Sequence, residues 1–454
     1  MHVTEQFARY AVGSRGSVLA PEVVHHAKRA VIDWHAAVFP GLQTEPVLAL
    51  TSALAEDLDR GDACLPTGRA ATVRAAALIQ GAAAHAAEVD DSYRDAMYHP
   101  GAATIAAALA LAQSVGASGE RFLRAVVVGY EISTRIGEVM GRAHYRYWHN
   151  TGTVGTFGAA AAAAELLRLD VAAFAHALAT AATFAAGLQQ AFRLDSMSKP
   201  LHPGRAAEGG VLAARFAATG ATGALDILEG EVGFGRALGD GPDWSRVAET
   251  LGRDFHVTRL TFKNHVGCGH AFPAIDGALA LQRRENIAAD RIERVRVSTY
   301  RPALDIACYP RPQTANEARF SIPYVVATAL VHGSVRMAAY EPPRLHDERT
   351  RALMERVDVG VDAELDARFP GMRAARVEIT LRDGRRFSHL QPNRKGDPEE
   401  PLDDHEVDGK LLELASPVIG ELRARALLAQ IRSLETRQDV RFATADAPHT
   451  RHTT

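Results

Sequence analysis

The stretch SMSKPLHPGRAAEGG, residues 196–210, brings three basic side chains close together. Lys199, His202 and Arg205 are separated by two prolines and a glycine, which favour a fixed non-helical path before a predicted helix over 206–219. Such a turn favours a bound anion, because its cations and the free N–H groups of a helix N-terminus all attract negative charge. The alternative is a solvated basic turn with ordinary capping.

A second group lies in AAEVDDSYRDAMYHPGAA, residues 86–103. We expect Glu88 and Asp91 to share one face of a helix end, with Ser92 next to them and His99 after a short loop. Two carboxylates this close repel each other, so they are either solvated or matched by cations. The alternative is a hydrophilic helix end capped by its own Ser and Asp side chains.

A third group precedes the alanine-rich stretch GTFGAAAAAAELLRL. Tyr145 and His149 lie just before it, and Thr151 or Thr153 is expected to cap the helix that follows. At that position the helix dipole would help His149 to hold an anion. The alternative is a partly buried aromatic cluster with a satisfied histidine.

A fourth group, TFKNHVGCGHAFPAIDG, contains Lys263, His265, Cys268 and His270 just before another predicted helix. A zinc site is an alternative, but the spacing H-x2-C-x-H matches no standard ligand pattern. We therefore predict that this segment binds no metal and that Cys268 is buried.

Together the four groups offer what an enzyme needs to bind a small polyanion and move a proton. Removing a proton next to a carboxylate creates further negative charge on the substrate, which lysine and arginine can neutralise. Nucleotide-binding and serine-hydrolase signatures are absent: there is no Walker A loop, no G-x-S-x-G elbow and no glycine-rich loop after a strand.

Length and composition exclude several other classes of protein. The 454 residues exceed a single hydrophobic core, so we expect two domains, with three as an alternative. A net charge of −3 disfavours a nucleic-acid partner, and three cysteines indicate a reducing compartment rather than a disulfide framework. Without an apolar signal core or a membrane-length apolar run, we expect a cytoplasmic protein with no membrane partner.

The elements that must position these groups are predicted to be mainly helical. Alanine-rich helical periodicity dominates residues 1–264, which we expect to form a large all-α domain. A smaller α+β domain is expected over 265–397, and a helical segment over 398–440 returns to the large domain. The tail, 441–454, is expected to be disordered.

Local patterns within the smaller domain are more specific. RIERVRVST alternates charged and β-branched residues, as a half-buried strand does. AARVEITLRDGRRFSHLQP predicts a hairpin whose turn is Asp383-Gly384. Between them, NEARFSIPYVVATALVHGSV predicts a helix with Pro323 near its start, and Asp403 or Asp404 is expected to cap the helix that follows the domain.

Several of these motifs, in this order, resemble the MmgE/PrpD family: HPGAATIAAALALA, GTVGTFGAAAAAAELLRLD, SKPLHPGRAAEGG followed by ILEG, KNHVGCGHAFPAIDGA and EARFSIPYVVATAL. The resemblance covers residues 5–435. It implies a large all-α domain with a smaller α+β lid, usually a homodimer, and an active site in the cleft between them. The family includes 2-methylcitrate dehydratase, cis-aconitate decarboxylase and iminodisuccinate epimerase, which act on small polycarboxylates without a cofactor or metal.

The same resemblance implies site residues. The family's D-x-D-D-T-like segment matches Glu88, Asp90, Asp91 and Ser92, with Glu and Ser as departures. The remaining family positions match His99, His149, Lys199, Lys263 and Tyr324. Lys199, His202 and Arg205, with Glu88, Ser92 and Tyr324, are then expected to bind substrate.

The reaction stays open at this point. The segment KNHVGCGH is closer to the epimerase-like branch, which makes His265 and Tyr145 a candidate pair of opposed acid/base groups. His149 and Lys263 are the other main catalytic candidates, with Asp91 and His99 orienting groups or transferring a proton. We expect a dehydratase or an epimerase, with a decarboxylase as the alternative and an inactive polycarboxylate-binding protein as the alternative of another class.

Overall fold

The computed structural model describes residues 1–192, 196–307 and 309–442. It divides into two compact units, which are described separately. The helical unit comprises Met1–Leu260 and the chain from Asp403 onward, and the α+β unit comprises Thr261–Leu402. These boundaries lie a few residues from the expected ones at 264/265 and 397/398. The expected disordered tail lies almost wholly outside the described residues.

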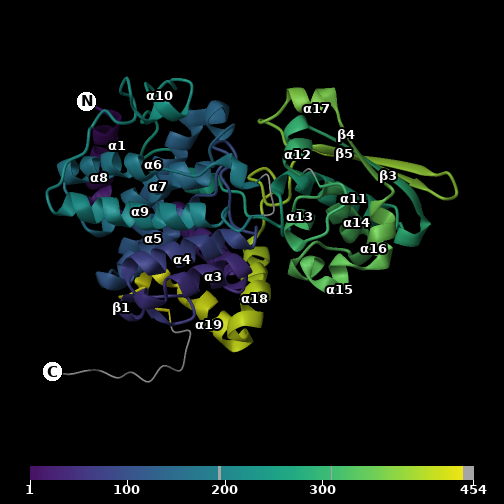
Figure 1. The fold of residues 1–454 in the computed structure, drawn as a ribbon, viewed down its shortest axis with the longest axis horizontal. Coiled ribbons are helices and arrows are strands. Elements are labelled where there is room, and N and C mark those ends of the chain that lie inside the picture. Colours follow the sequence, from purple (N-terminus) through teal and green to yellow (C-terminus); the bar gives the residue numbers. More distant parts are fainter. Residues whose placement is uncertain (193–195, 308, 443–454) are drawn as a thin grey trace. The chain divides into compact units, whose positions relative to one another are not determined.

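The helical unit is built from long alanine-rich helices (Figure 1). Its helices are α1 (Val3–Gly13), α2 (Pro21–Gly41), α3 (Glu45–Ala53), α4 (Val73–Ala86), α5 (Pro100–Ser114), α6 (Gly119–Tyr145), α7 (Asn150–Leu166), α8 (Val171–Phe184), α9 (Leu201–Ala218), α10 (Phe234–Leu238), α18 (Asp404–Ile419) and α19 (Glu421–Arg432). Helix α7 is buried at every residue, as its alanine run predicts, and it packs against α5, α6, α8 and α9.

The prediction that this unit is all-α is wrong in one place. A short hairpin of β1 (Leu58–Cys64) and β2 (Ala70–Ala71) precedes α4. The β1 sequence LDRGDAC is exposed over its four central residues, so it lacks the alternation that marks a half-buried strand.

Glycines let α4, α7 and α9 approach closely. A Cβ on Gly81 of α4 would lie 2.9 Å from the Cα of Gly204 on α9. A Cβ on Gly210 of α9 would lie 2.5 Å from the backbone nitrogen of Ala160 on α7. Contacts this short leave room only for glycine, so these residues fix how closely α4, α7 and α9 pack.

Helix α9 begins earlier than expected. Pro203 and Gly204 lie in its first turn instead of an irregular turn, and Pro200 is the N-cap. Proline is compatible with this position because the N–H groups of the first turn have no intrahelical acceptor. The basic residues His202 and Arg205 are therefore helical, and only Lys199 precedes the helix.

The α+β unit contains a four-stranded sheet of order β4-β3-β5-β6. Its strands are β3 (Ile292–Thr299), β4 (Val357–Val361), β5 (Ala375–Leu381) and β6 (Arg386–Gln391); β3 and β4 are parallel and the other pairs are antiparallel. The predicted strand and hairpin are confirmed. Gly384 has φ +86° in the hairpin turn, which is the left-handed region that glycine tolerates.

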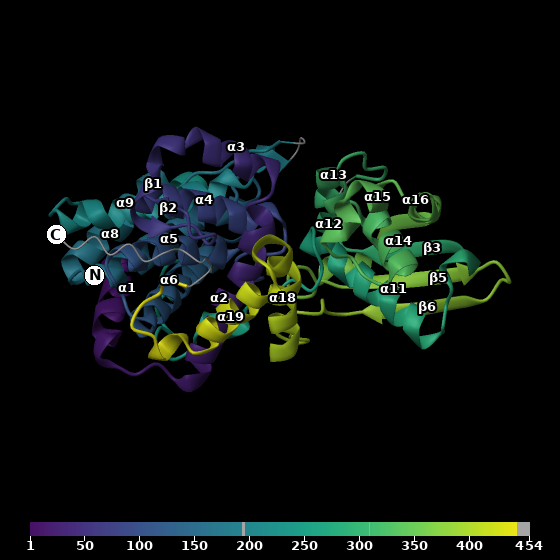
Figure 2. The same ribbon diagram turned by 90° about the horizontal axis from the view of Figure 1, so that it is seen from below.

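Helices pack on one face of this sheet (Figure 2). They include α11 (Phe272–Arg284), which contacts β5 and β6, and α14 (Ile322–His332), which contacts β4 and α11. The other helices of the unit are α12 (Arg301–Ile306), α13 (Ala315–Arg319), α15 (Pro342–Leu345), α16 (Glu348–Met354) and α17 (Ala363–Ala367). The helix expected over NEARFSIPYVVATALVHGSV is interrupted at Ser321, whose side chain caps α14.

The C-terminal helices return to the helical unit, as the sequence predicts. Asp403 caps α18 in a capping box with Glu406, and α18 packs against α2. Among the described helices, none combines the length and the apolar character that crossing a membrane requires.

Candidate active site

Four histidines gather where the ends of four helices meet. His85 lies in the last turn of α4, His99 and His149 are the N-caps of α5 and α7, and His202 lies in the first turn of α9. The His85 ring centroid is 4.9 Å from that of His99 and 5.3 Å from that of His149. The His149 and His202 centroids are 5.2 Å apart. We call these residues the histidine cluster.

Three of the four helix ends are N-termini, which carry partial positive charge. Neither His99 nor His149 caps its helix through its side chain, so the first N–H groups of α5 and α7 are not satisfied in that way. The expected caps have other partners: Thr151 accepts from the His99 N–H at 3.3 Å, and Thr153 bonds His144 at 2.7 Å. The expectation that either threonine caps α7 is therefore wrong.

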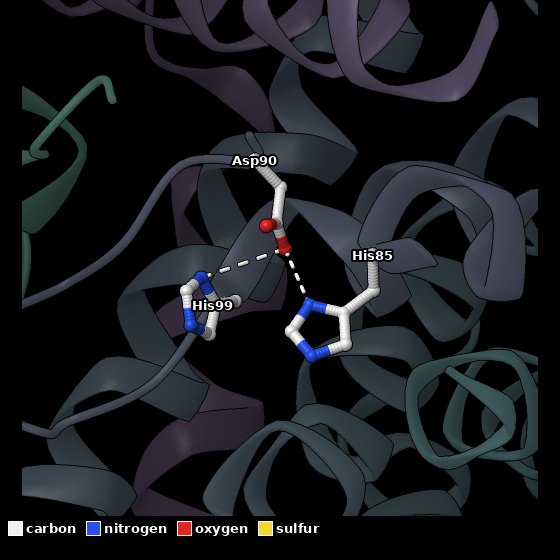
Figure 3. A group of neighbouring side chains, drawn as sticks. All are labelled: His85, Asp90 and His99. Carbon is white, nitrogen blue, oxygen red and sulfur yellow. Dashed lines mark hydrogen bonds and ion pairs between the residues drawn. The ribbon is translucent and has the colours of Figure 1, made fainter. Parts of the chain in front are cut away.

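Asp90 links two of the histidines (Figure 3). Its Oδ2 lies 2.7 Å from Nδ1 of His85 and 3.4 Å from Nδ1 of His99. Nδ1 of His99 is also 2.6 Å from the carbonyl oxygen of Asp91. A carbonyl oxygen can only accept, so His99 carries its proton on Nδ1 and a neutral ring has its lone pair on Nε2. His99 thereby has the form of a general base.

Two imidazoles and a carboxylate are also a ligand set for zinc or iron. The ligand atoms of His85, Asp90 and His99 lie within 4.8 Å of one another, the one such group in the described parts of the chain. In this arrangement, however, Nδ1 of His99 donates to the Asp91 carbonyl, so that nitrogen has no lone pair to offer an ion. The geometry fits a hydrogen-bonded proton network better than a preformed metal centre.

Burial keeps three histidines of the cluster, His85, His149 and His202, neutral. Desolvation lowers the pKa of His85 to about 3 and that of His149 well below its usual value, and neighbouring histidines lower the latter further. Desolvation and then the charge of Lys199 lower the pKa of His202 to about 4. At neutral pH these rings are free bases.

His149 and His202 are directly hydrogen-bonded. Their Nδ1 atoms are 3.0 Å apart, so one ring donates and the other accepts. Because each ring's second nitrogen has the opposite role, the pair can present either a donor or an acceptor at Nε2 of His149. This arrangement suits a group that must give or take a proton during a reaction.

The carboxylates of the loop after α4 are buried, and the expected shared helix face is wrong. Helix α4 ends at Ala86. Glu88 has φ +58°, a left-handed backbone conformation that costs free energy for residues other than glycine. Glu88 forms an ion pair with Lys199, so this carboxylate is matched by a cation. Lys199 also lies 4.9 Å from the centre of the Phe192 ring.

Asp91 has a different environment. Its carboxylate accepts hydrogen bonds from the Tyr130 hydroxyl at 2.7 Å and from the Gly101 N–H at 3.0 Å. Burial, followed by repulsion from Asp33, nevertheless raises its pKa to about 8. A Cβ at Gly101 would lie 2.7 Å from the Tyr130 oxygen, so the glycine after Pro100 is required by this close contact.

A buried lysine from the C-terminal segment lies beneath this loop. Nζ of Lys410, on α18, is 2.5 Å from Oδ1 of Asp33 and 2.7 Å from the carbonyl oxygen of Val89. The side chains of Lys410 and Asp33 are almost fully buried. Lys410 therefore both pairs a buried charge and ties the loop that carries Glu88, Asp90 and Asp91 to α2.

The remaining predicted residues of the helical unit are less closely tied to the cluster. Ser92 is buried in the same loop, and Tyr145 is the half-buried last residue of α6. Arg205 is half-exposed and pairs with Glu208, which also binds Arg74. Arg205 thus belongs to a surface group of ion pairs, and its expected role in substrate binding stays a prediction.

The α+β unit holds the other predicted residues. Lys263 and His265 are buried, and Nε2 of His265 bonds Oδ1 of Asp276 at 2.8 Å. The Tyr324 hydroxyl donates to the carbonyl of Ala339, a bond that a substrate would have to replace. The predicted pairing of His265 with Tyr145 joins two units that are described separately, so it stays a prediction.

The zinc alternative at Lys263–His270 gains no support. Cys268 is buried as expected, and His270 bonds the Tyr300 hydroxyl at 2.9 Å while His265 bonds Asp276. Within the described residues, this segment does not bring three potential ligands together.

Sequence reasoning about catalysis missed His85, Tyr130 and Lys410. His85 had a local signal, because it stands five residues before Asp90 at the end of a predicted helix. Tyr130 and Lys410 had none: Lys410 is 321 residues from the carbonyl that it binds.

Comparisons with known proteins agree with this architecture. The MmgE/PrpD N-terminal domain matches residues 5–247, and the MmgE/PrpD C-terminal domain matches residues 265–436. The cis-aconitate decarboxylase-like protein oryM of Aspergillus oryzae is 29% identical over 467 residues, covering 97% of this chain and 96% of that protein. The cis-aconitate decarboxylases of Mus musculus and Homo sapiens are each 26% identical, covering 96% of this chain and 91% and 92% of theirs. The chain belongs to the MmgE/PrpD family.

Proposed function

We propose that this protein is a lyase that acts on a small di- or tricarboxylate by moving a proton at a carbon next to a carboxylate. The observation that carries the proposal is the histidine cluster itself. Three helix N-termini and Lys199 meet around neutral, hydrogen-bonded imidazoles. Positive ends attract a polyanion, and neutral imidazoles can accept its proton.

Substrate carboxylates would be held by Lys199 and by N–H groups at the start of α7, since the N–H groups of His99 and Gly101 at the start of α5 already donate to Thr151 and Asp91. Lys199 already binds one carboxylate, that of Glu88, so the position suits a carboxylate oxygen. An incoming substrate carboxylate would bind Lys199 together with Glu88 or would displace Glu88 from it. Glu88 would then control how strongly Lys199 binds the substrate.

His99 is the general base that the geometry favours. Its Nδ1–H is held by the Asp91 carbonyl, which leaves Nε2 as the acceptor. Asp90 lies 3.4 Å away and would stabilise the imidazolium that forms when a proton arrives. The His99 side chain is 21% exposed, whereas His85 is fully buried, so a ligand can reach it more readily.

The hydrogen-bonded pair of His149 and His202 would supply the second proton transfer. A lyase must return a proton either to the substrate or to a leaving group. When Nε2 of His149 takes a proton, the shared proton can pass from its Nδ1 to Nδ1 of His202, and His202 releases its own Nε2 proton; His149 is then neutral and a donor at Nε2. One well-placed acid or base contributes roughly 10²–10⁴ in rate.

The names of the curated relatives make cis-aconitate the first substrate to test, with loss of CO₂ as the reaction. Dehydration of a hydroxy-tricarboxylate and epimerisation of a dicarboxylate use the same kinds of group. The products distinguish the three reactions. Decarboxylation gives CO₂ and a shifted double bond, dehydration gives an alkene and water, and epimerisation gives a changed stereocentre.

Proton NMR in D₂O with cis-aconitate, citrate, 2-methylcitrate and iminodisuccinate tests the proposal. We expect conversion, or deuterium entry next to a carboxylate, for at least one of them. His149→Gln and Lys199→Ala should each lower the rate about 10²–10⁴-fold with the fold intact, whereas His25→Gln, at a half-exposed histidine of the same unit, should not.

Near-full turnover in both His149→Gln and Lys199→Ala would refute the site. Ligand-induced thermal stabilisation without exchange or conversion of any acid would instead favour the polycarboxylate-binding alternative.

A further inference from the structure

A second concentration of positive charge lies at the other end of α7. A pocket of about 190 Å³ is lined by Arg15, Glu120, Arg121, Arg124, Glu165 and Arg168. Arg15 comes from the short 3-10 helix η1 (Ser14–Gly16), and Glu120, Arg121 and Arg124 come from the start of α6. Glu165 lies in the last turn of α7, and Arg168 follows it. We call this the arginine pocket.

The arginine pocket is separate from the histidine cluster. His149 caps the first turn of α7 and Glu165 lies in its last turn. At a rise of 1.5 Å per residue, the two positions are about 24 Å apart along the helix. A ligand in the pocket would therefore not be the substrate bound by Lys199.

Neutral backbone acceptors hold two of the arginines in place. Arg124 donates to the carbonyls of Ser14, at 2.8 Å, and Ser17. Arg121 donates to the carbonyl of Leu166 at 3.0 Å. Carbonyl groups orient a guanidinium without cancelling its charge, so both arginines stay available to an anion.

The carboxylates of the pocket neutralise only part of this charge. Four guanidinium groups face two carboxylates, which leaves two positive charges (4 − 2 = 2). Only one pair is direct: Nε of Arg15 lies 2.9 Å from Glu165, while the Nη2 atom of Arg15 is buried without a hydrogen-bond partner. Arg124 is 7% exposed and Glu165 6%, so water screens these charges poorly.

The start of α6 adds to the positive potential. Arg121 and Glu120 lie in its first turn, at the positive end of the helix dipole, although Ser118 Oγ accepts from the Arg121 N–H and the Arg437 carbonyl accepts from the Gly119 N–H. Two unmatched guanidinium charges, beside a helix N-terminus and around a hollow, constitute a built anion site.

We propose that the arginine pocket binds a compact oxyanion carrying two negative charges, as a phosphate group or a dicarboxylate does. The charge of the proposed ligand follows from the charge balance of the pocket, because two negative charges cancel its excess of two positive charges. Its class follows from residue type, because the planar guanidinium binds the paired oxygens of phosphate and carboxylate. Binding there would tie together η1, α6 and α7.

Isothermal titration calorimetry with inorganic phosphate and with succinate, at constant ionic strength against chloride, tests the proposal. The titrations use Lys199→Gln protein, so that binding at the histidine cluster is weakened. We expect one site per chain for at least one probe, and the probe that binds more tightly identifies the source of the dianion.

The double variant Arg121→Gln/Arg168→Asn should bind that probe at least tenfold more weakly. The matched control Arg236→Gln/Arg253→Gln removes two exposed arginines of the same unit outside the pocket, and should bind as before. If the double variant fails to fold, Arg168→Asn alone replaces it. Arg168 is exposed and has φ +53°, which asparagine tolerates, and we expect a threefold or greater loss.

Absence of binding by either probe, or an equal loss in the control variant, would overturn the proposal. Because the Lys199→Gln background and the readout are independent of turnover, failure of the lyase proposal would not produce either result.

Discussion

Each unit of the protein buries an aspartate among polar side chains, and the pKa values of these two groups, Asp91 and Asp397, shift in opposite directions. In the helical unit, Tyr130 and Gly101 donate hydrogen bonds to Asp91, and burial nevertheless raises its pKa to about 8. In the α+β unit, burial would likewise raise the pKa of Asp397, but the charge and hydrogen bonds of Arg394 and the hydroxyl of Thr261 outweigh it. They lower that pKa to about 2.

The contrast shows that burial alone does not decide a protonation state. At these two positions the neighbours decide: Asp91 receives hydrogen bonds from neutral groups, whereas Asp397 lies against the guanidinium of Arg394. The histidine cluster also holds neutral groups, which suits proton transfer. The pair Arg394–Asp397 is charged, which suits a fixed scaffold.

The largest expected effect concerns the buried cation of the helical unit. Lys410→Met leaves the Asp33 carboxylate, which is fully buried, without its ion pair. We expect a loss of about 3–5 kcal/mol in the free energy of unfolding, measured by urea denaturation.

Lys28→Met is the matched control. Lys28 pairs with Glu435, whose side chain is 38% exposed, and also donates to the Arg432 carbonyl; because water reaches Glu435, we expect a loss of about 0–1 kcal/mol from this ion pair. An equal loss in the two variants would show that the Lys410 pair is no more important than this partly exposed pair.

Asp397→Asn tests the charged cluster of the α+β unit. Asparagine keeps one acceptor oxygen but removes the charge that faces Arg394, so we expect a loss of about 1.5–3 kcal/mol at pH 7. The folded-state pKa of Asp397 is lowered, so its contribution is present above about pH 4 and is lost as the pH falls toward 2. The difference between wild type and variant should therefore shrink in acid. A constant difference from pH 7 to pH 2 would contradict the assignment.

Asp91→Asn should show the opposite dependence on pH. The folded-state pKa of Asp91 is raised to about 8, so from about pH 4 to pH 8 the folded protein holds a proton that the unfolded chain has lost. Wild-type stability then falls with rising pH, and the neutral asparagine avoids this loss. The melting temperature of the variant relative to wild type should rise between pH 4 and pH 8. A relative melting temperature that falls over this range would contradict the raised pKa.

The sequence predicted the parts of the site that local signals mark. Proline and glycine punctuate the starts of α5 and α9, and the alanine run defines α7, so His99, His149 and Lys199 were identified as residues at helix starts. The hairpin of the α+β unit followed from Asp383-Gly384 and from alternation. For α7 and the hairpin the pattern and the element coincide, whereas α9 begins at Leu201, five residues before the helix that the sequence predicts.

The features of the site that the sequence did not predict depend on contacts between residues far apart in the chain. The loop of Glu88 was expected to continue a helix, but the Lys410 contact and the pair with Lys199 hold it in an irregular path. The pKa of Asp91 depends on burial and on Asp33, which no local pattern reports. Such features come from residues brought together by packing of α2, α4 and α18.

The smallest expected effect concerns Arg205, which the sequence grouped with Lys199 and His202. In the structure the Arg205 side chain is 54% exposed and pairs with Glu208, whereas the Lys199 side chain is 12% exposed beside the histidine cluster. Since Arg74 also binds Glu208, removing Arg205 leaves no unpaired buried carboxylate. Arg205→Gln should therefore change stability by less than about 1 kcal/mol and leave kcat/KM within about twofold, in contrast to Lys199→Ala. A loss comparable to that of Lys199→Ala would instead place Arg205 among the residues that bind substrate, as the basic stretch in the sequence first suggested.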